Sequence, residues 1–204
     1  MEHAIKPFVV ACVGDSITEG VGASDTRRTS YPARLQTLLG DGYAVQNYGL
    51  GGMTLLTQGD YPYVRQARYP ASLGCRPDIV LLMLGTNDSK PQNWRYRERF
   101  LPELIDMIRA YQRLPTSPRV LVATSPSVLR DIDGITEAVV GREIVPLQKQ
   151  AARQTGCDVV DIYALTQGHA EWTADGIHPN DEGYVRLADA FARVVTGRQE
   201  GSAK

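Results

Sequence analysis

Residues 8–20 are Phe8-Val-Val-Ala-Cys-Val-Gly-Asp-Ser16-Ile-Thr-Glu-Gly20. The first six of these residues are apolar, and the run stops abruptly at a glycine, an aspartate and a serine. A short apolar run that is rich in valine and bounded by glycine is typical of a buried strand. We therefore expect Ser16 to lie just past the end of a strand.

Similar runs recur along the chain and alternate with helical patterns. We predict strands at residues 8–13, 43–48, 78–84, 119–124 and 157–162. We predict helices at 31–39 after the N-cap Ser30, at 101–111 after a separate turn, at 137–155 with Pro146 as a kink or late start, and after Asn180. Strand–helix alternation indicates parallel strands covered on both faces. The expected fold is α/β, a flavodoxin-like three-layer α/β/α sandwich with a central parallel sheet of about five strands.

Length and composition favour one globular domain. The 204 residues are enough for a single domain with a sizeable core, spanning 1–204 with a flexible tail at 197–204. A formal net charge of -1 gives no reason to expect nucleic acid as a partner. No apolar run approaches the roughly 18 residues of a membrane span, so we expect no membrane insertion. The sequence does not predict an oligomeric state.

The N-terminus and the cysteines give weaker indications. One lysine and a short apolar run that leads straight into a motif do not form a signal peptide, so we expect a cytoplasmic protein. A secreted form whose signal was removed stays an open alternative. Cys12, Cys75 and Cys157 are odd in number and widely spaced, which favours buried free thiols over disulfides or a zinc site. We expect no metal and no cofactor.

Polar, glycine-rich loops follow the predicted strands. They cover residues 14–16, 47–52, 85–88 and 175–178. In a doubly wound sheet such loops meet on one rim, at the carboxyl ends of the strands. A serine hydroxyl is a poor nucleophile unless a base lies within hydrogen-bond reach and a third group holds that base. Together the loops offer a serine, a histidine with a nearby aspartate, and N–H donors for an oxyanion, which is what acyl transfer requires.

These loops resemble the sequence blocks of the SGNH, or GDSL-type, hydrolase family, which is named for its Ser, Gly, Asn and His. The matching residues are Gly14-Asp15-Ser16, Gly52, Asn87 and Asp175-Gly-Ile-His178-Pro179. Ile17 stands where the GDSL name has leucine, a mild departure. One block alone would be weak evidence, but all four occur in order, and the resemblance spans residues 8 to about 192.

The resemblance implies a role for each matching residue. Ser16 would attack an ester carbonyl, and His178 would accept its proton and pass it to the leaving alcohol. Asp175 would hold the imidazole in the required tautomer. The oxyanion hole would consist of the backbone N–H groups of Ser16 and Gly52 and the side-chain amide of Asn87, which donates without adding a competing charge.

The substrate is less well specified than the reaction. We expect a small-molecule ester, an acetylated sugar by preference, because residues 87–94 and 59–63 place polar groups and aromatic rings beside the oxyanion loops. These stretches also resemble the carbohydrate or sialate O-acetylesterase branch of the family. Asp15, Lys90 and Trp94 are the candidate substrate-binding residues. Asp15 also suits a role in shaping the loop around Ser16, and Trp94 could simply pack in the core.

Two other functions stay open at this point. A lysophospholipase or thioesterase should carry a long apolar acyl groove, and the sequence contains no extra Leu- or Phe-rich loop beside the site. A non-catalytic sugar-binding module on the same fold would not need an intact set of Ser16, Gly52, Asn87, Asp175 and His178. The expected function is therefore that of a serine esterase for short acyl groups, which works through an acyl-enzyme intermediate.

Overall fold

A computed structural model of the chain describes residues 6–197. Its central sheet has the strand order β2-β1-β3-β4-β5, and all neighbouring strands are parallel. The strands are β1 (Phe8–Gly14), β2 (Tyr43–Asn47), β3 (Ile79–Met83), β4 (Arg119–Ala123) and β5 (Asp158–Val160). This order makes β1 and β3 neighbours, with β2 on one side of β1 and with β3, β4 and β5 on the other. Sheets of this kind form their sites at the point where the strand order reverses, which here lies between β1 and β3.

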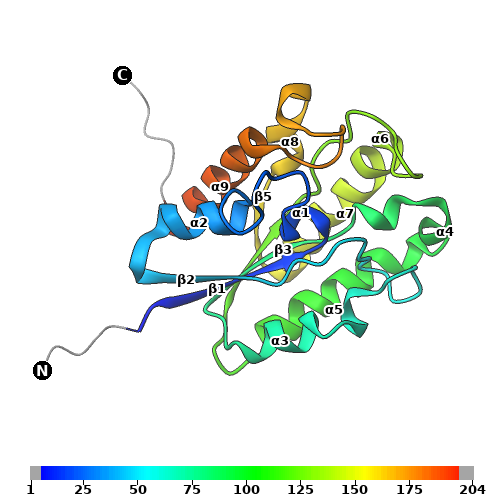
Figure 1. The fold of residues 1–204 in the computed structure, drawn as a ribbon. Coiled ribbons are helices and arrows are strands. Elements are labelled where there is room, and N and C mark those ends of the chain that lie inside the picture. Colours follow the sequence, from blue (N-terminus) through cyan, green and yellow to red (C-terminus); the bar gives the residue numbers. More distant parts are fainter. Residues whose placement is uncertain (1–5, 198–204) are drawn as a thin grey trace, which may run out of the picture.

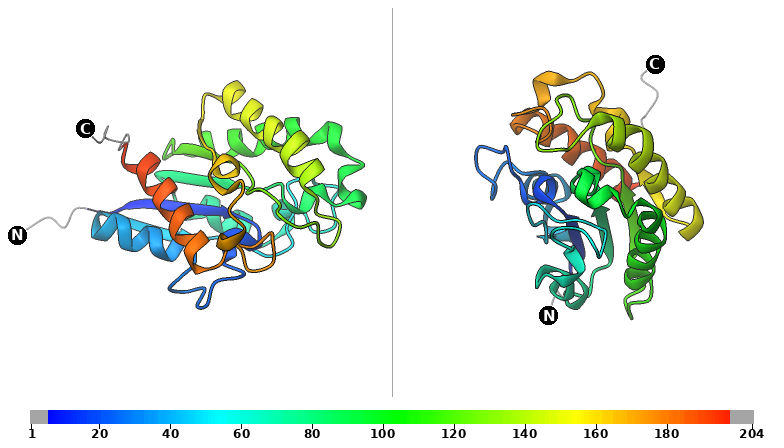
Figure 2. Two further views of the ribbon diagram at one scale, coloured as in Figure 1. Left: turned by 90° about the horizontal axis from the view of Figure 1, so that it is seen from above. Right: turned by 90° about the vertical axis from the view of Figure 1, so that its right-hand side faces the viewer.

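Helices cover both faces of the sheet, as Figures 1 and 2 show. The α-helices among the described residues are α1 (Ser16–Glu19), α2 (Tyr31–Leu39), α3 (Arg68–Gly74), α4 (Pro91–Trp94), α5 (Phe100–Gln112), α6 (Glu137–Val139), α7 (Val145–Thr155), α8 (Ile162–Thr166) and α9 (Asp181–Thr196). Helices α5 and α7 pack on one face, and α2 and α9 pack on the other. The predicted three-layer α/β/α sandwich with a parallel five-stranded sheet is thus confirmed.

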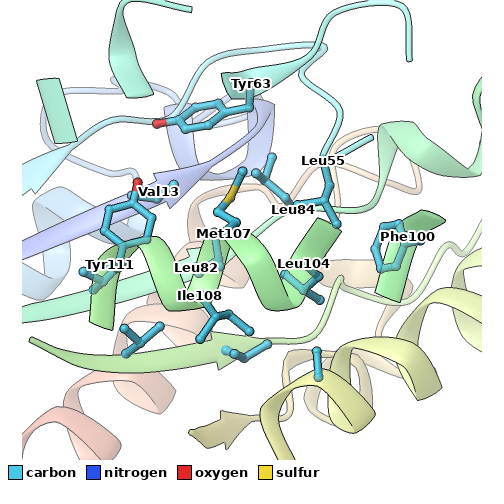
Figure 3. Close-up of a cluster of buried hydrophobic side chains, with 14 of the residues drawn as sticks. Val13, Leu55, Tyr63, Leu82, Leu84, Phe100, Leu104, Met107, Ile108 and Tyr111 are labelled. Carbon is cyan, nitrogen blue, oxygen red and sulfur yellow. The ribbon is translucent and has the colours of Figure 1, made fainter. Parts of the chain in front are cut away.

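Alternate residues of the strands supply the two halves of the core. Val80 and Leu82 of β3 point into the layer of α5 and α7, whereas Leu81 and Met83 point into the layer of α2 and α9. Figure 3 shows part of the first layer, in which α5 places Leu104, Met107, Ile108 and Tyr111 against the sheet. Burial on both faces explains why β3 is a continuous apolar run rather than an alternating one.

Most predicted elements lie within two residues of the observed ones, and the exceptions have local causes. The fifth strand ends at Val160 because the Asp161 side chain accepts a hydrogen bond from the Ala164 N–H and so starts α8, which we did not predict. The predicted helix 137–155 is broken by a π-helical turn, η5 (Val140–Ile144), which ends two residues before Pro146. Ser30 occupies the N-cap position of α2, but its hydroxyl donates to the Thr26 carbonyl instead of capping the helix.

Three further expectations concerned the C-terminal tail, membrane insertion and the cysteines. Of the predicted tail at 197–204, residues 198–204 lie outside the described part of the chain. No helix within residues 6–197 is long and apolar enough to cross a membrane. Cys12 is buried, Cys75 and Cys157 are half-buried, and all three are free thiols.

Candidate active site

Ser16 lies at the carboxyl end of β1, as predicted. The buried strand ends at Gly14, and Asp15 caps the short helix α1 by accepting a hydrogen bond from the Ile17 N–H at 3.0 Å. Ser16 is the first residue of this helix, so its own N–H has no partner within the helix. The turn from a buried strand into a capped helix thus places the Ser16 hydroxyl and its backbone N–H together on the rim of the sheet.

A chain of hydrogen bonds joins the Ser16 hydroxyl to an imidazole and a carboxylate. The distance from Ser16 Oγ to His178 Nε2 is 3.0 Å, and the distance from His178 Nδ1 to Asp175 Oδ2 is 2.7 Å. Ser16 and His178 are 162 residues apart in the sequence, and the loop that follows η6 (Ala170–Trp172) brings them together. This arrangement can activate a hydroxyl, because the ring can accept the serine proton while the carboxylate holds the ring.

The Asp175 carboxylate is held for this position by its own loop. Oδ1 accepts hydrogen bonds from the backbone N–H groups of Ile177 (2.9 Å) and His178 (2.8 Å), which leaves Oδ2 for the imidazole. Partial burial alone would raise the pKa of Asp175. The hydrogen bonds from the His178 ring and from these backbone groups outweigh burial and hold the pKa below its usual value, so the carboxylate stays ionised.

Gly52 and Asn87, the two other predicted site residues, lie on neighbouring loops of the same rim. Gly52 has φ of +78°, a backbone conformation that favours glycine. No acceptor for its N–H occurs among residues 6–197. Asn87 is 6% exposed and uses one amide N–H on the Met53 carbonyl at 3.2 Å, which leaves the second N–H available. These donors could serve a developing oxyanion beside Ser16.

The loop that carries Gly52 approaches α1 very closely. A Cβ atom on Gly49 would lie 2.2 Å from the backbone nitrogen of Glu19, so only glycine fits there. A Cβ on Gly51 would lie 3.7 Å from the Ser16 Cβ and 2.9 Å from a Glu19 carboxylate oxygen. The Gly51 N–H donates to that oxygen at 2.8 Å. The loop is therefore packed against the helix that carries Ser16.

Asp15 and Trp94, two of the predicted substrate-binding residues, are both largely buried. Asp15 is 1% exposed, and Trp94, which is 6% exposed, still lines a surface pocket together with Ser89 and Pro91. The Asp15 carboxylate accepts a hydrogen bond from the Ile17 N–H, and the Trp94 indole N–H donates to Glu143 at 2.9 Å, so a role of either residue in substrate binding stays a prediction. Lys90 is half-buried, and its role stays a prediction.

The two tyrosines of the stretch 59–63 differ in exposure. Tyr63 is fully buried, and its hydroxyl donates to the Tyr48 carbonyl. Tyr61 is 61% exposed. Of the three aromatic rings that suggested a sugar contact, Tyr61 is the most exposed.

Two buried carboxylates lie under the rim. Burial raises the pKa of Asp15 to about 6, although the Ile17 N–H and the nearby His178 lower it in part. Burial also raises the pKa of Asp88 to about 7, against hydrogen bonds from the backbone of Leu56 and Leu55, and the charge of Asp15 raises it further. Strongly shifted carboxyl groups of this kind are frequent at functional sites.

Sequence reasoning missed two parts of the site. Glu19 is one helical turn after Ser16 and so lies on the same face of α1, a spacing that could have been recognised. The loop after β4 packs against the Asp175 loop, where the Leu129 N–H donates to the Gly176 carbonyl at 2.8 Å. Its position after a strand was the available signal. Within residues 6–197 no group of three or more His, Cys, Asp or Glu side chains is arranged to hold a metal ion.

The chain is similar to several known proteins. The chain is 36% identical over 212 residues to an acetylxylan esterase from Xylanibacter ruminicola, in a match that covers 95% of this chain and 44% of that protein. The chain thus spans less than half the length of this curated relative. A GDSL lipase from Mycobacterium tuberculosis is 24% identical over 200 residues, covering 96% of this chain and 84% of the other.

A solved structure and a family profile complete the comparison. The structure of a carbohydrate acetylesterase family member from Sinorhizobium meliloti matches with a TM-score of 0.75 at 22% identity, over 93% of this chain and 98% of that one, which supports the fold. The profile of the GDSL-like lipase/acylhydrolase family matches residues 12–186, a range that contains every residue of the hydrogen-bonded site. The chain belongs to the GDSL-like lipase/acylhydrolase family.

Proposed function

We propose that this protein is a serine esterase that removes acetyl or similarly short acyl groups from carbohydrates, through a Ser16–His178–Asp175 triad and an acyl-enzyme intermediate. The observation that carries the proposal is the unbroken series of hydrogen bonds from Ser16 Oγ through the His178 ring to Asp175. A hydroxyl, a base and an orienting carboxylate at these distances form the arrangement used for nucleophilic acyl transfer.

In the first half of the reaction, Ser16 Oγ bonds to the acyl carbon while its proton passes to Nε2 of His178. The carbonyl π electrons move to the oxygen and give a tetrahedral oxyanion. When this intermediate collapses, the bond to the alcohol breaks, and the imidazolium returns the proton to the leaving oxygen. Water then repeats the sequence on the acyl-Ser16 ester, which releases the carboxylic acid and restores the hydroxyl.

The negative charge of each tetrahedral intermediate requires donors that are already in place. We assign this role to the backbone N–H groups of Ser16 and Gly52 and to the second N–H of the Asn87 amide. Donors fixed by the fold cost no reorganisation when the charge develops, and one such donor typically contributes a factor of about 10² to 10³ in turnover.

The choice of substrate rests on three observations. The curated relative at 36% identity is an acetylxylan esterase. A two-domain esterase active on acetylated mannans, crystallised with mannopentaose, has the same fold, with a TM-score of 0.70 at 22% identity over 97% of this chain and 52% of that one. The exposed ring of Tyr61 is the kind of surface on which a sugar ring packs.

Hydrolysis profiling tests the proposal. The protein is incubated with acetylated xylan, acetylated mannan and a series of nitrophenyl esters from acetyl to decanoyl, with Ser16→Ala as the blank. We expect acetate release from an acetylated polysaccharide and a fall in kcat/KM from acetyl or butyryl toward decanoyl. A matched acyl groove would instead gain about 0.8 kcal/mol for each buried CH₂. A steep gain toward decanoyl without acetate release would indicate a lipolytic enzyme and overturn the substrate assignment.

A further inference from the structure

The loop that carries Gly52 lacks regular secondary structure on either side of the glycine. Residues 48–53 form turns and irregular backbone between β2 and an isolated bridge at Thr54. A donor on such a segment is useful only if other groups fix the segment. The inference that follows rests on the proposed oxyanion role of Gly52 and Asn87. It concerns the groups that fix the positions of these two N–H donors relative to each other.

Asp88 holds the loop from one side. This carboxylate is completely buried, and it directly follows Asn87 in the chain. Its Oδ2 accepts a hydrogen bond from the Leu55 N–H at 2.9 Å, and its Oδ1 accepts one from the Leu56 N–H at 2.8 Å. Both oxygens are thus committed to backbone that begins three residues after Gly52.

The neighbouring amide reinforces this connection. The Asn87 side chain donates to the Met53 carbonyl at 3.2 Å, one residue after Gly52. Three hydrogen bonds therefore join two consecutive residues at the end of β3 to the segment 53–56. A displacement of this segment would move the Gly52 N–H away from the Asn87 amide.

Glu19 holds the loop from the opposite side. Its Oε2 accepts a hydrogen bond from the Gly51 N–H at 2.8 Å, and its backbone carbonyl accepts one from the Asn47 amide at 3.3 Å. Because Glu19 and Ser16 lie on the same face of α1, this contact fixes the position of the loop relative to Ser16. Gly52 lies between the residues held by Glu19 and those held by Asp88.

We propose that Asp88 and Glu19 are positioning residues of the oxyanion hole, which fix the Gly52 loop between the Asn87 amide and the Ser16 helix. Burial of a carboxylate costs free energy unless hydrogen bonds compensate for it, so a buried Asp88 is a strong constraint on the backbone that it binds. Neither side chain contacts the reacting atoms.

The two carboxylates predict different responses to the same chemical change. Asp88 uses both oxygens as acceptors, so in Asp88→Asn one of the two backbone N–H groups would face an amide NH₂, which cannot accept. Glu19 uses one oxygen, so Glu19→Gln can keep the bond to Gly51 through its remaining oxygen, whereas Glu19→Ala cannot. This contrast separates positioning by hydrogen bonds from an effect of charge alone.

Steady-state kinetics on nitrophenyl acetate test the proposal, together with the affinity for a trifluoromethyl ketone, whose adduct with Ser16 places an oxyanion in the hole. We expect Asp88→Asn to lower kcat about 10- to 100-fold with little change in KM, and to weaken the ketone by a similar factor. Glu19→Ala should lose about 10-fold in kcat, and Glu19→Gln should stay near the parent. The double variant Asn87→Ala/Asp88→Asn should lose less kcat than the product of the losses in the two single variants.

Asp78→Asn is the matched control. The Asp78 carboxylate accepts a hydrogen bond from the Val9 N–H at 2.7 Å, at the opposite end of the sheet. The same chemical change there should leave kcat unchanged, because the remaining oxygen of the amide can still accept this hydrogen bond far from the site. If Asn87→Ala lowers kcat while Asp88→Asn and Glu19→Ala do not, the positioning roles are overturned and the oxyanion assignment stands. If Asn87→Ala has no effect, both the assignment and this inference fail. If Asp88→Asn does not fold, the Glu19→Ala and Glu19→Gln pair decides.

Discussion

Two aspartates at this site have the same local geometry but opposite electrostatics. Asp15 and Asp175 each accept a hydrogen bond through Oδ1 from the N–H of an isoleucine two residues later. Asp15 is 1% exposed, and burial raises its pKa to about 6. The Asp175 side chain is 38% exposed, and although partial burial opposes them, its hydrogen bonds to His178 hold its pKa below the usual value.

The difference shows that a shared turn does not determine the role of a carboxylate. Asp175 has a second oxygen that reaches the imidazole, and enough solvent to remain charged. Asp15 is enclosed under the rim, where a charge is costly, and it serves the backbone around Ser16. The comparison therefore supports the proposal that the Asp175 loop takes part in proton transfer and that Asp15 supports the backbone around Ser16.

The largest expected effect comes from removing the hydroxyl that lies between these loops. Ser16→Ala should lower kcat by at least about 10⁴-fold, because the members of a triad act as a unit. The fold should persist, since Ser16 donates no hydrogen bond that a core residue needs. Nitrophenyl acetate hydrolysis and circular dichroism measure the two properties. Covalent labelling of a different serine by a fluorophosphonate in the parent protein would contradict the assignment.

Asp175→Asn should produce the next largest loss, and it tests the Asp175 half of the comparison. The amide can still accept from the backbone but cannot stabilise the charged imidazolium, so kcat should fall more than KM changes. The loss in kcat should be on the order of 10³-fold, so the residual activity should exceed that of Ser16→Ala by about 10-fold or more. Steady-state kinetics of both variants in one assay give this ratio, and an unchanged kcat would remove Asp175 from the mechanism.

Asn87→Ala should have a smaller effect, because it removes one oxyanion donor and leaves the triad intact. The expected loss in kcat is on the order of 10²-fold with little change in KM. The measurement is the same kinetic comparison. A change confined to KM would instead identify Asn87 as a contact of the bound ester in its ground state.

Sequence patterns were sufficient for the strands and the longer helices for physical reasons, and the family resemblance pointed to the residues of the proposed triad. Buried parallel strands are continuous apolar runs, so β1 and β3 were recognisable, and the Asn180 cap marked the start of α9. Ser16, Asn87 and His178 stand in short motifs that directly follow strands or a turn. Their positions could be predicted because local sequence and sheet topology together place them on one rim.

Other features depended on tertiary contacts that no local pattern contains. Trp94 in a polar stretch suggested an exposed ring, yet its indole lies in the core beside Phe100, and Glu143, 49 residues away, accepts its N–H. The burial of Asp88 follows from its contact with the backbone of residues 55 and 56. The sequence alone does not state which segment of chain will cover a polar group.

The smallest expected effect on turnover belongs to Asp15→Asn, which tests the Asp15 half of the comparison through stability. The oxygen of the introduced amide can keep the bond from the Ile17 N–H, so most of the activity should remain.

The folded-state pKa of Asp15, about 6, is above the reference value of 3.8. The folded protein therefore binds more protons than the unfolded chain between these values, and this group makes the free energy of unfolding decrease as pH rises through that interval. The variant should lose this decrease, about 1 to 3 kcal/mol in size. Urea denaturation of both proteins at pH 4 and pH 7 measures it, and Asp78→Asn serves as the carboxylate control. Parallel pH profiles for the parent and Asp15→Asn would mean that ionising Asp15 does not carry the free-energy cost that its burial implies.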